Sequence, residues 1–262
     1  MTIKMYPTSN ILFFCLLFSL LVSCGGETKK EENVVLNKES DDDLSLPFDQ
    51  RIKNHVERKI DITQGENYSL KVYEDHLNDD NKLDYVITIN RFENALKKAK
   101  VENNVARSSE LGFFGEHNYI VYYSSITNKF SDPIPFGSSP QRELGISFEN
   151  ISSDKHKDVL VDYSIRNSQF RKVFLFMNDK PIYAFHWQLY DGWGTDKLEA
   201  FCFEYGKGSY SDVKDIILRK ATMKNISSTD DYYKITPEIE CTDVLVKRFF
   251  FNSRDGKYYT PN

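Results

Sequence analysis

The segment His186–Gly194 of the sequence, which reads HWQLYDGWG, gathers several side chains that could bind a ligand. It holds both tryptophans of the chain, Trp187 and Trp193, together with polar groups and two glycines. Aromatic rings on a loop can stack on a sugar or on a peptide side chain, so both tryptophans are candidate ligand-binding residues. The alternative is packing, because Trp187 falls on an alternating strand, Trp193 falls at a hairpin end, and large aromatic rings dominate protein cores.

Short motifs of the common catalytic centres do not occur in the sequence. The five histidines lack metal-ligand spacing on one helix, and there is no HExxH, no GxSxG and no phosphate-binding glycine loop. Glu116 and His117 are further candidates for chemistry, but no partner is assigned to them. Carboxylates are plentiful, so a glycosidase-like carboxylate pair stays open as an alternative. These observations favour a binding protein and leave the catalytic residues unassigned.

The first residues of the chain have the parts of a secretory signal peptide. Lys4 supplies a positive charge, and the apolar run Ile11–Val22 leads to a small residue, Ser23. The run is shorter than the roughly 20 apolar residues that a membrane-spanning helix needs. The ending Leu-Val-Ser-Cys resembles the lipobox of bacterial lipoproteins, in which the cysteine is acylated. The resemblance implies that residues 1–23 are removed and that Cys24 carries lipid, including palmitate.

Residues 24–46 are expected to form a flexible tether. The segment is polar, charged and poor in aromatic residues, so it cannot bury enough apolar surface to fold. Its cluster Lys29–Glu32 resembles the charged export signal of surface lipoproteins of Bacteroidetes, although charge runs are usually solvated spacers. These features predict a protein anchored to the outer membrane of a Gram-negative bacterium, on the periplasmic face or at the cell surface.

The remaining residues, 47–262, are enough for a single domain with a substantial core. The formal net charge of the whole chain is −5 at pH 7, and removal of Lys4 with the signal segment makes it more acidic. Nucleic acid is therefore not expected as a partner, because phosphate binding needs a basic surface. Cys202 and Cys241 remain in a compartment that permits disulfides, so they either form a bridge or are two buried thiols.

Strand signals dominate this domain. Tyr and Phe are abundant, and several segments alternate between apolar and polar residues, as half-buried strands do. Turn residues at 178–180 and 253–256 predict two hairpins. The segment 47–59 could form a helix, and 92–105 is either a helix or a long exposed loop. The alternating segments are 84–90, 118–123, 158–165, 172–177, 181–187 and 244–251.

A polar loop followed by a strand recurs along the chain. The copies begin at His76, Asn150 and, more weakly, Asn225, and they end at Asp84, Asp158 and Asp231. This recurrence predicts one small antiparallel unit per copy, packed against its neighbours.

The first copy resembles the D-x-N-x-D-G-x-x-D loop of FG-GAP and VCBS-type repeats, and the ending Asp-Gly-Lys-Tyr at 255–258 resembles that of Bacteroidetes lipoproteins. The resemblance implies a mainly β fold with antiparallel sheets, built of about three degenerate propeller-blade-like units. A propeller typically has at least four blades, so a β-sandwich-like or α+β arrangement is the alternative. The chain departs from the motif, with Asn81 and Lys155 where the family has glycine.

Calcium is the metal that such loops would hold. It takes about six to eight oxygen ligands, several of them carboxylates, and alternate positions of a tight loop point their oxygens inward. The alternative is an ordinary turn, whose Asp and Asn side chains bond backbone amides, and the small number of negative charges favours it. The candidate ligands are Asn78, Asp80, Asp84, Asn150, Asp154 and Asp158.

The sequence thus predicts a lipid-anchored envelope lipoprotein that binds a ligand or partner without catalysis. Its partners would be the membrane, through the lipid, and an envelope or extracellular protein or glycan. A secreted hydrolase and a structural or assembly accessory of the envelope are the alternatives.

Overall fold

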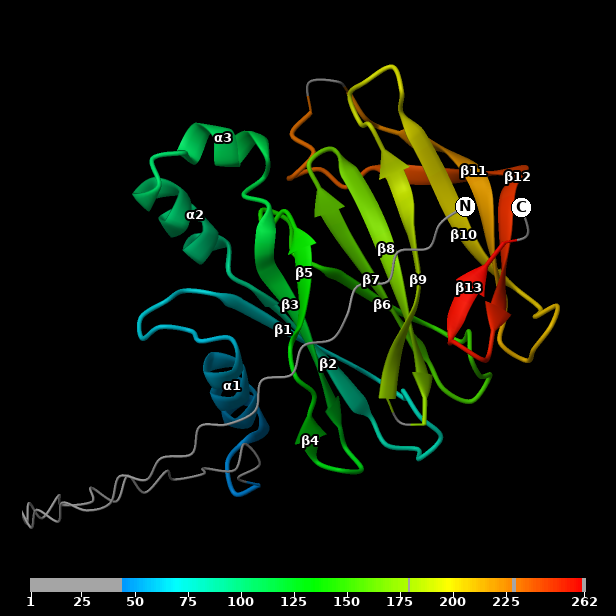
Figure 1. Ribbon diagram of the computed structural model, residues 1–262, viewed down its shortest axis with the longest axis horizontal. Coiled ribbons are helices and arrows are strands. Elements are labelled where there is room, and N and C mark those ends of the chain that lie inside the picture. Colours follow the sequence, from blue (N-terminus) through cyan, green and yellow to red (C-terminus); the bar gives the residue numbers. More distant parts are fainter. Residues whose placement is uncertain (1–43, 179, 228–229, 261–262) are drawn as a thin grey trace, which may run out of the picture. The chain divides into compact units, whose positions relative to one another are not determined.

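The computed structural model describes residues 44–260 except 179, 228 and 229. The predicted signal segment, Cys24 and nearly all of the tether therefore lie outside the described residues. Residues Ser40–Asn262 cluster as one compact unit. Strands make up 48% and helices 13%, and all strand pairs are antiparallel, so the predicted mainly β antiparallel class is confirmed (Figure 1). Within the described residues no helix is long and apolar enough to cross a membrane.

The first sheet has five strands and carries three helices. β1 forms one end of the sheet, and β5 pairs with β3 beside β4. Helix α1 precedes the sheet, whereas α2 and α3 are inserted between β2 and β3. The strands are β1 (Ser69–Asp75), β2 (Asp84–Asn90), β3 (Gly115–Ser124), β4 (Lys129–Phe130) and β5 (Ile134–Ser138), and the helices are α1 (Phe48–Lys59), α2 (Phe92–Val101) and α3 (Val105–Glu110).

The sequence explains how α1 covers one face of this sheet. Phe48, Ile52 and Val56 recur every four residues and so form one apolar stripe of the helix. The stripe packs on Ile87 and Ile89, which point to the same face of β2 because successive side chains of a strand alternate. The opposite face of the sheet is left for the second sheet.

The second sheet is a meander of eight strands in the order β13-β12-β11-β10-β9-β8-β7-β6. It curls, because residues of β7–β9 and of β11–β13 pack in one hydrophobic cluster. The predicted hairpins are present as β8–β9 and β12–β13. The strands are β6 (Gly145–Glu149), β7 (Asp158–Ile165), β8 (Ser168–Met177), β9 (Lys180–Asp191), β10 (Glu199–Gly206), β11 (Asp215–Lys224), β12 (Glu238–Asn252) and β13 (Lys257–Tyr259).

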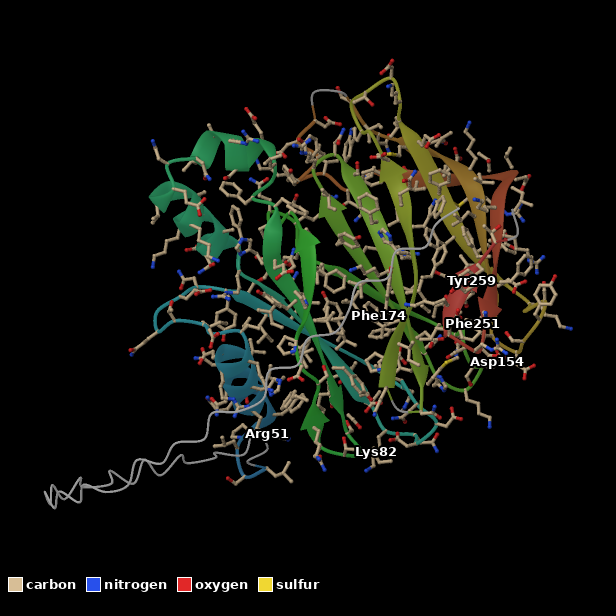
Figure 2. The ribbon with its side chains drawn as sticks, in the orientation of Figure 1. Arg51, Lys82, Asp154, Phe174, Phe251 and Tyr259 are labelled. Atoms are coloured by element: carbon tan, nitrogen blue, oxygen red, sulfur yellow. A yellow bond between two sulfur atoms is a disulfide. The ribbon has the colours of Figure 1, made fainter. Side chains whose placement is uncertain are left out.

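The two sheets pack face to face through a second cluster. Val86 and Phe136 of the first sheet meet Val161 and Phe174 of the second, and all four are at most 4% exposed. Full burial of one such side chain stabilises the fold by roughly 1.5–3 kcal/mol. Figure 2 marks Phe174 in this layer and Phe251 in the core of the curled second sheet.

The expectation of three blade-like units is corrected by this topology. The second and third units do not form separate blades, because β6–β13 hydrogen-bond in one continuous sheet. The third loop was also misplaced. Residues 232–237 form turns and coil, and β12 begins only at Glu238, since Pro237 has no amide hydrogen to donate to a ladder. The loop that corresponds to the first two spans residues 208–214 and leads into β11.

Candidate functional site

Three loops of the fold share one feature, an aspartate at the first position of the strand that follows. Asp84 begins β2, Asp158 begins β7 and Asp215 begins β11. These side chains are 0%, 0% and 1% exposed. A buried carboxylate is costly unless it is paired or hydrogen-bonded, so each loop must supply donors.

The donor comes in each loop from the residue six positions before the aspartate. Asn78 Nδ2 donates to Asp84 Oδ2 over 2.9 Å. Ser152 Oγ donates to Asp158 Oδ1 over 2.7 Å, and Ser209 Oγ donates to Asp215 Oδ2 over 2.6 Å. The repeated geometry shows that these three loops are structural equivalents.

Further donors complete the shell of Asp158. The amides of Ile151 and Ser152 donate to Oδ2 over 2.9 and 2.6 Å, and the amide of Phe176 donates to Oδ1 over 2.8 Å. Burial raises the pKa of Asp158 above its ordinary value, and these hydrogen bonds oppose that rise. The carboxylate thus ties its loop to β8.

The other predicted calcium ligands also contact protein donors. Asn150 Oδ1 accepts from Lys157 Nζ over 2.6 Å, and Asp80 Oδ1 accepts from the amide of Lys82 over 2.7 Å. Asp154, labelled in Figure 2, has a side chain that is 90% exposed, and its Oδ1 lies 3.4 Å from Lys214 Nζ. Among the described residues, no group of three or more His, Cys, Asp or Glu side chains is arranged to hold a metal. The contacts are those of Asx-type turns, and calcium binding stays a prediction for direct measurement.

The two tryptophans lie in different hydrophobic clusters. Trp193 is 3% exposed, donates from Nε1 to the Ser227 carbonyl over 3.3 Å, and packs edge-on against Tyr190. Trp187 lies on β9 and packs against Phe249 at 5.4 Å between ring centroids. Trp193 is therefore packed in a core cluster, the two rings do not form one stacking platform, and ligand binding by either tryptophan stays a prediction.

Cys202 and Cys241 form a disulfide between β10 and β12. Both strands flank β11, in which Arg219 pairs with Cys202 and Ala221 pairs with Cys241. The pairing of β11 with β12 is irregular on both sides of Arg219, where β12 carries extra residues. The bridge joins two strands that are not direct neighbours in the sheet.

His117 lies on β3 beside a small pocket of about 220 Å³ beneath α2 and α3. Burial, together with the nearby charges of Lys98 and Arg91, lowers the pKa of His117 to about 4. The imidazole is therefore neutral at physiological pH. No hydrogen bond ties it to the Glu116 side chain among the contacts of the described residues.

A groove of about 810 Å³ lies at the rim of the contact between the two sheets. β1 and β6 are the end strands of their sheets, and both contribute to its wall. Ser69, Lys71 and Tyr73 alternate along β1 and so present one face of that strand. The remaining lining comes from Asn67, Tyr68, Asn90, Phe92, Glu93, the segment 140–145 and Tyr233.

A buried amide network fixes one wall of the groove. Asn90 Nδ2 donates to Asn118 Oδ1 over 2.8 Å and to the Pro140 carbonyl over 2.7 Å. Asn118 Nδ2 in turn donates to Ser138 Oγ over 2.9 Å. The network joins three strands of the first sheet to the segment that carries Gln141 and Arg142, so this wall is formed before any ligand binds.

The charges of the groove have partners within the protein. Lys71 Nζ lies 2.5 Å from Glu143, and Ser69 Oγ donates to the same carboxylate over 2.7 Å. Burial alone would raise the pKa of Glu143, but the bonds from Lys71 and Ser69 hold it below its ordinary value. Arg142 donates to the hydroxyl of Tyr190 over 3.1 Å and to the Ile235 carbonyl. The groove thus offers aromatic rings and amides, while its Lys71 is ion-paired and its Arg142 is hydrogen-bonded to neutral groups of the protein.

Comparisons of the chain with protein-family models, with curated proteins and with solved structures find no match.

The sequence did not indicate this groove. Its residues come from segments that are far apart in the chain and meet only because β1 and β6 end their sheets at the same rim. The one local signal was the polar run Pro140–Glu143 between two strand-like segments, which is typical of a turn as well as of a binding loop.

Proposed function

We propose that this protein is a lipid-anchored envelope lipoprotein whose β-rich unit binds an uncharged glycan in the groove between β1 and β6. The observation that carries the proposal is the lining of the groove, where aromatic rings and side-chain amides accompany the Lys71–Glu143 ion pair and an Arg142 that is hydrogen-bonded within the protein. A charged ligand would compete with these contacts, whereas a neutral ligand leaves them in place.

Sugars suit this lining for two physical reasons. The ring faces of tyrosine and phenylalanine pack against the C–H groups of a pyranose, and amides such as Asn67 and Gln141 both donate and accept hydrogen bonds. Both features support binding of a neutral sugar.

The geometry favours binding over glycoside hydrolysis. A glycosidase needs a carboxylic acid whose pKa is raised, so that it can donate a proton to the leaving group. Burial raises the pKa of Asp158, but this carboxyl group is fully buried in its loop and lies outside the groove. In the groove, the pKa of Glu143 is lowered.

The groove is tested by titrating the soluble fragment Ser40–Asn262 with a panel of neutral oligosaccharides in a calorimeter. Replacement of Asn67 and Gln141 by alanine should weaken binding of the best ligand by about tenfold or more, since it removes two hydrogen-bonding side chains. Asn54→Ala, on the exposed surface of α1, serves as the matched control and should leave the affinity unchanged. Retained affinity in the double variant would reject the groove as the site.

The anchor is tested separately in a Gram-negative host fed with labelled palmitate. The natural chain should incorporate the label and sediment with outer membranes, whereas Cys24→Ser should do neither. Ser23→Ala keeps the cysteine and a small residue before it, so it should behave as the natural chain. Labelling of the Cys24→Ser protein would remove the lipoprotein assignment without affecting the groove.

A further inference from the structure

Lys172 of β8 is a half-buried lysine without a hydrogen bond or ion pair to any described residue. Its ammonium group lies 4.5 Å from the ring centroid of Phe136, 5.3 Å from that of Tyr163 and 5.7 Å from that of Tyr183. Aromatic faces attract a cation, but they accept none of its three N–H donors in ordinary hydrogen bonds. The ammonium therefore keeps its full capacity to donate to a ligand.

His186 and Tyr163 stand beside this ammonium group. Lys172 and His186 are register partners on β8 and β9, so their side chains share one face of the sheet. The hydroxyl of Tyr163 and Nε2 of His186 are 2.8 Å apart. The rings of Tyr163, Phe170 and His186 lie within 30° of parallel in each pair and form a stacked group.

A second lysine adds positive charge at the same place. Lys257 of β13 places its ammonium group 4.1 Å from the ring centroid of Tyr183 and donates to the Tyr183 carbonyl. Like Lys172, it forms no ion pair with a carboxylate in the part of the chain that the structure describes. Two lysines without a carboxylate partner near one tyrosine ring make this place locally positive, although the whole chain has a net charge of −5.

This cluster of side chains lies at the edge of the region in which the first sheet covers the second sheet. Phe174, next to Lys172 along this face, is 4% exposed beneath the first sheet, whereas Tyr183 is 42% exposed and His186 is also exposed. Burial lowers the pKa of Lys172, because the half-buried ammonium group is less hydrated than in water. An anion that reached the exposed side would restore that missing interaction.

We propose that Lys172, Tyr163 and His186 bind the carboxylate of an acidic sugar, with the exposed ring of Tyr183 against the sugar body. The carboxylate oxygens accept from the ammonium of Lys172 and from the Tyr163–His186 pair, and Lys257 adds attraction without direct contact. A pyranose ring supplies the C–H face that an aromatic ring packs against, which a free inorganic anion lacks. The site shares no residue with the groove between β1 and β6, so either site can fail without the other.

The proposal is tested by recording protein NMR spectra during titration with sodium galacturonate, galactose, sodium acetate and N-acetylglycine. Galacturonate should shift signals of β8 and β9 and bind at least about tenfold more tightly than galactose, which lacks the charge. Equal binding of galactose and galacturonate would overturn the carboxylate site. N-acetylglycine binding as tightly as galacturonate would overturn the assignment to a sugar, because it carries the carboxylate on a peptide.

Two variants and one control decide which residues carry the binding. Lys172→Met keeps the length and the apolar contacts of the side chain, and it should weaken galacturonate binding by about tenfold or more. His186→Gln is a second, exposed substitution and should weaken it as well. Lys129→Met on β4 removes one exposed lysine elsewhere and should change nothing. Unchanged affinity in both Lys172→Met and His186→Gln, with thermal unfolding showing both folded, would overturn the proposal.

Discussion

The hydroxyl of Ser152 donates a hydrogen bond of 2.7 Å to the carboxylate of Asp158, six residues later at the start of β7. Backbone amides from the same loop and from β8 donate further hydrogen bonds to the two oxygens of that carboxylate. The carboxylate oxygens that were predicted to bind calcium therefore accept hydrogen bonds from the protein itself. The loop has the contacts of a self-sufficient turn.

We therefore expect calcium to leave the stability of the protein unchanged. Melting curves of the Ser40–Asn262 fragment in EDTA and in millimolar calcium should have the same Tm, because a ligand raises Tm only if it binds the folded state. A clear upward shift in calcium would show that the loops rearrange to bind metal. Magnesium at the same concentration controls for ionic strength.

The aspartates of these loops should matter for stability even without a metal. Asp158→Ala leaves buried donors without an acceptor, and it should lower the free energy of unfolding by about 2–4 kcal/mol. Asp154→Ala in the same loop removes an exposed carboxylate and should change it by less than about 0.5 kcal/mol. Urea unfolding of both variants provides the comparison, and equal stabilities would contradict the structural role of Asp158.

The disulfide should contribute a large share of the stability. It closes a loop across a sequence separation of 39, for which the chain-entropy model gives about 4 kcal/mol. Replacement of both Cys202 and Cys241 by serine should lower the free energy of unfolding by about 2–4 kcal/mol. Urea unfolding of the natural fragment with and without reductant supplies an independent check. A reductant effect that persists in the double-serine variant would have another cause.

Stability should fall with acidification through the titration of His117. Burial holds its pKa at about 4, whereas an unfolded histidine has a pKa of about 6.5. Between these values the unfolded chain binds more protons, so this contribution is complete above pH 6.5 and is lost as the pH falls towards 4. His117→Gln should have a shallower slope of unfolding free energy between pH 6.5 and 4. An unchanged slope would show that other groups cause the acid sensitivity.

Much of the fold follows from local sequence patterns. Alternation in segments such as 84–90 and 158–165 predicts strands, and turn residues predict the hairpins β8–β9 and β12–β13. Local patterns could not predict whether the strands form three separate blade-like units or one continuous sheet. Whether the strand after Asp215 extends the sheet of β7 or begins a new one depends on edge pairing between distant segments, which leaves no periodic signal in either strand.

The sites were less accessible to sequence reasoning. The sequence indicated Trp193 as a candidate ligand-binding residue, but in the structure its ring packs against Tyr190 and Tyr232. Lys172, in contrast, looks in sequence like any polar residue of an alternating strand. That its ammonium group lacks an ion pair can be seen only when the neighbouring side chains of β5 and β9 are known, because the sequence does not say which residues surround it.

The bridge between Cys202 and Cys241 encloses the whole of β11 in a covalent ring. A protease that cuts anywhere inside this ring opens it but does not release either product. The nicked protein would run as one band in non-reducing electrophoresis and as two bands after reduction. β12 would also stay tethered to β10, so a single cut inside the ring would leave both pieces of the chain joined.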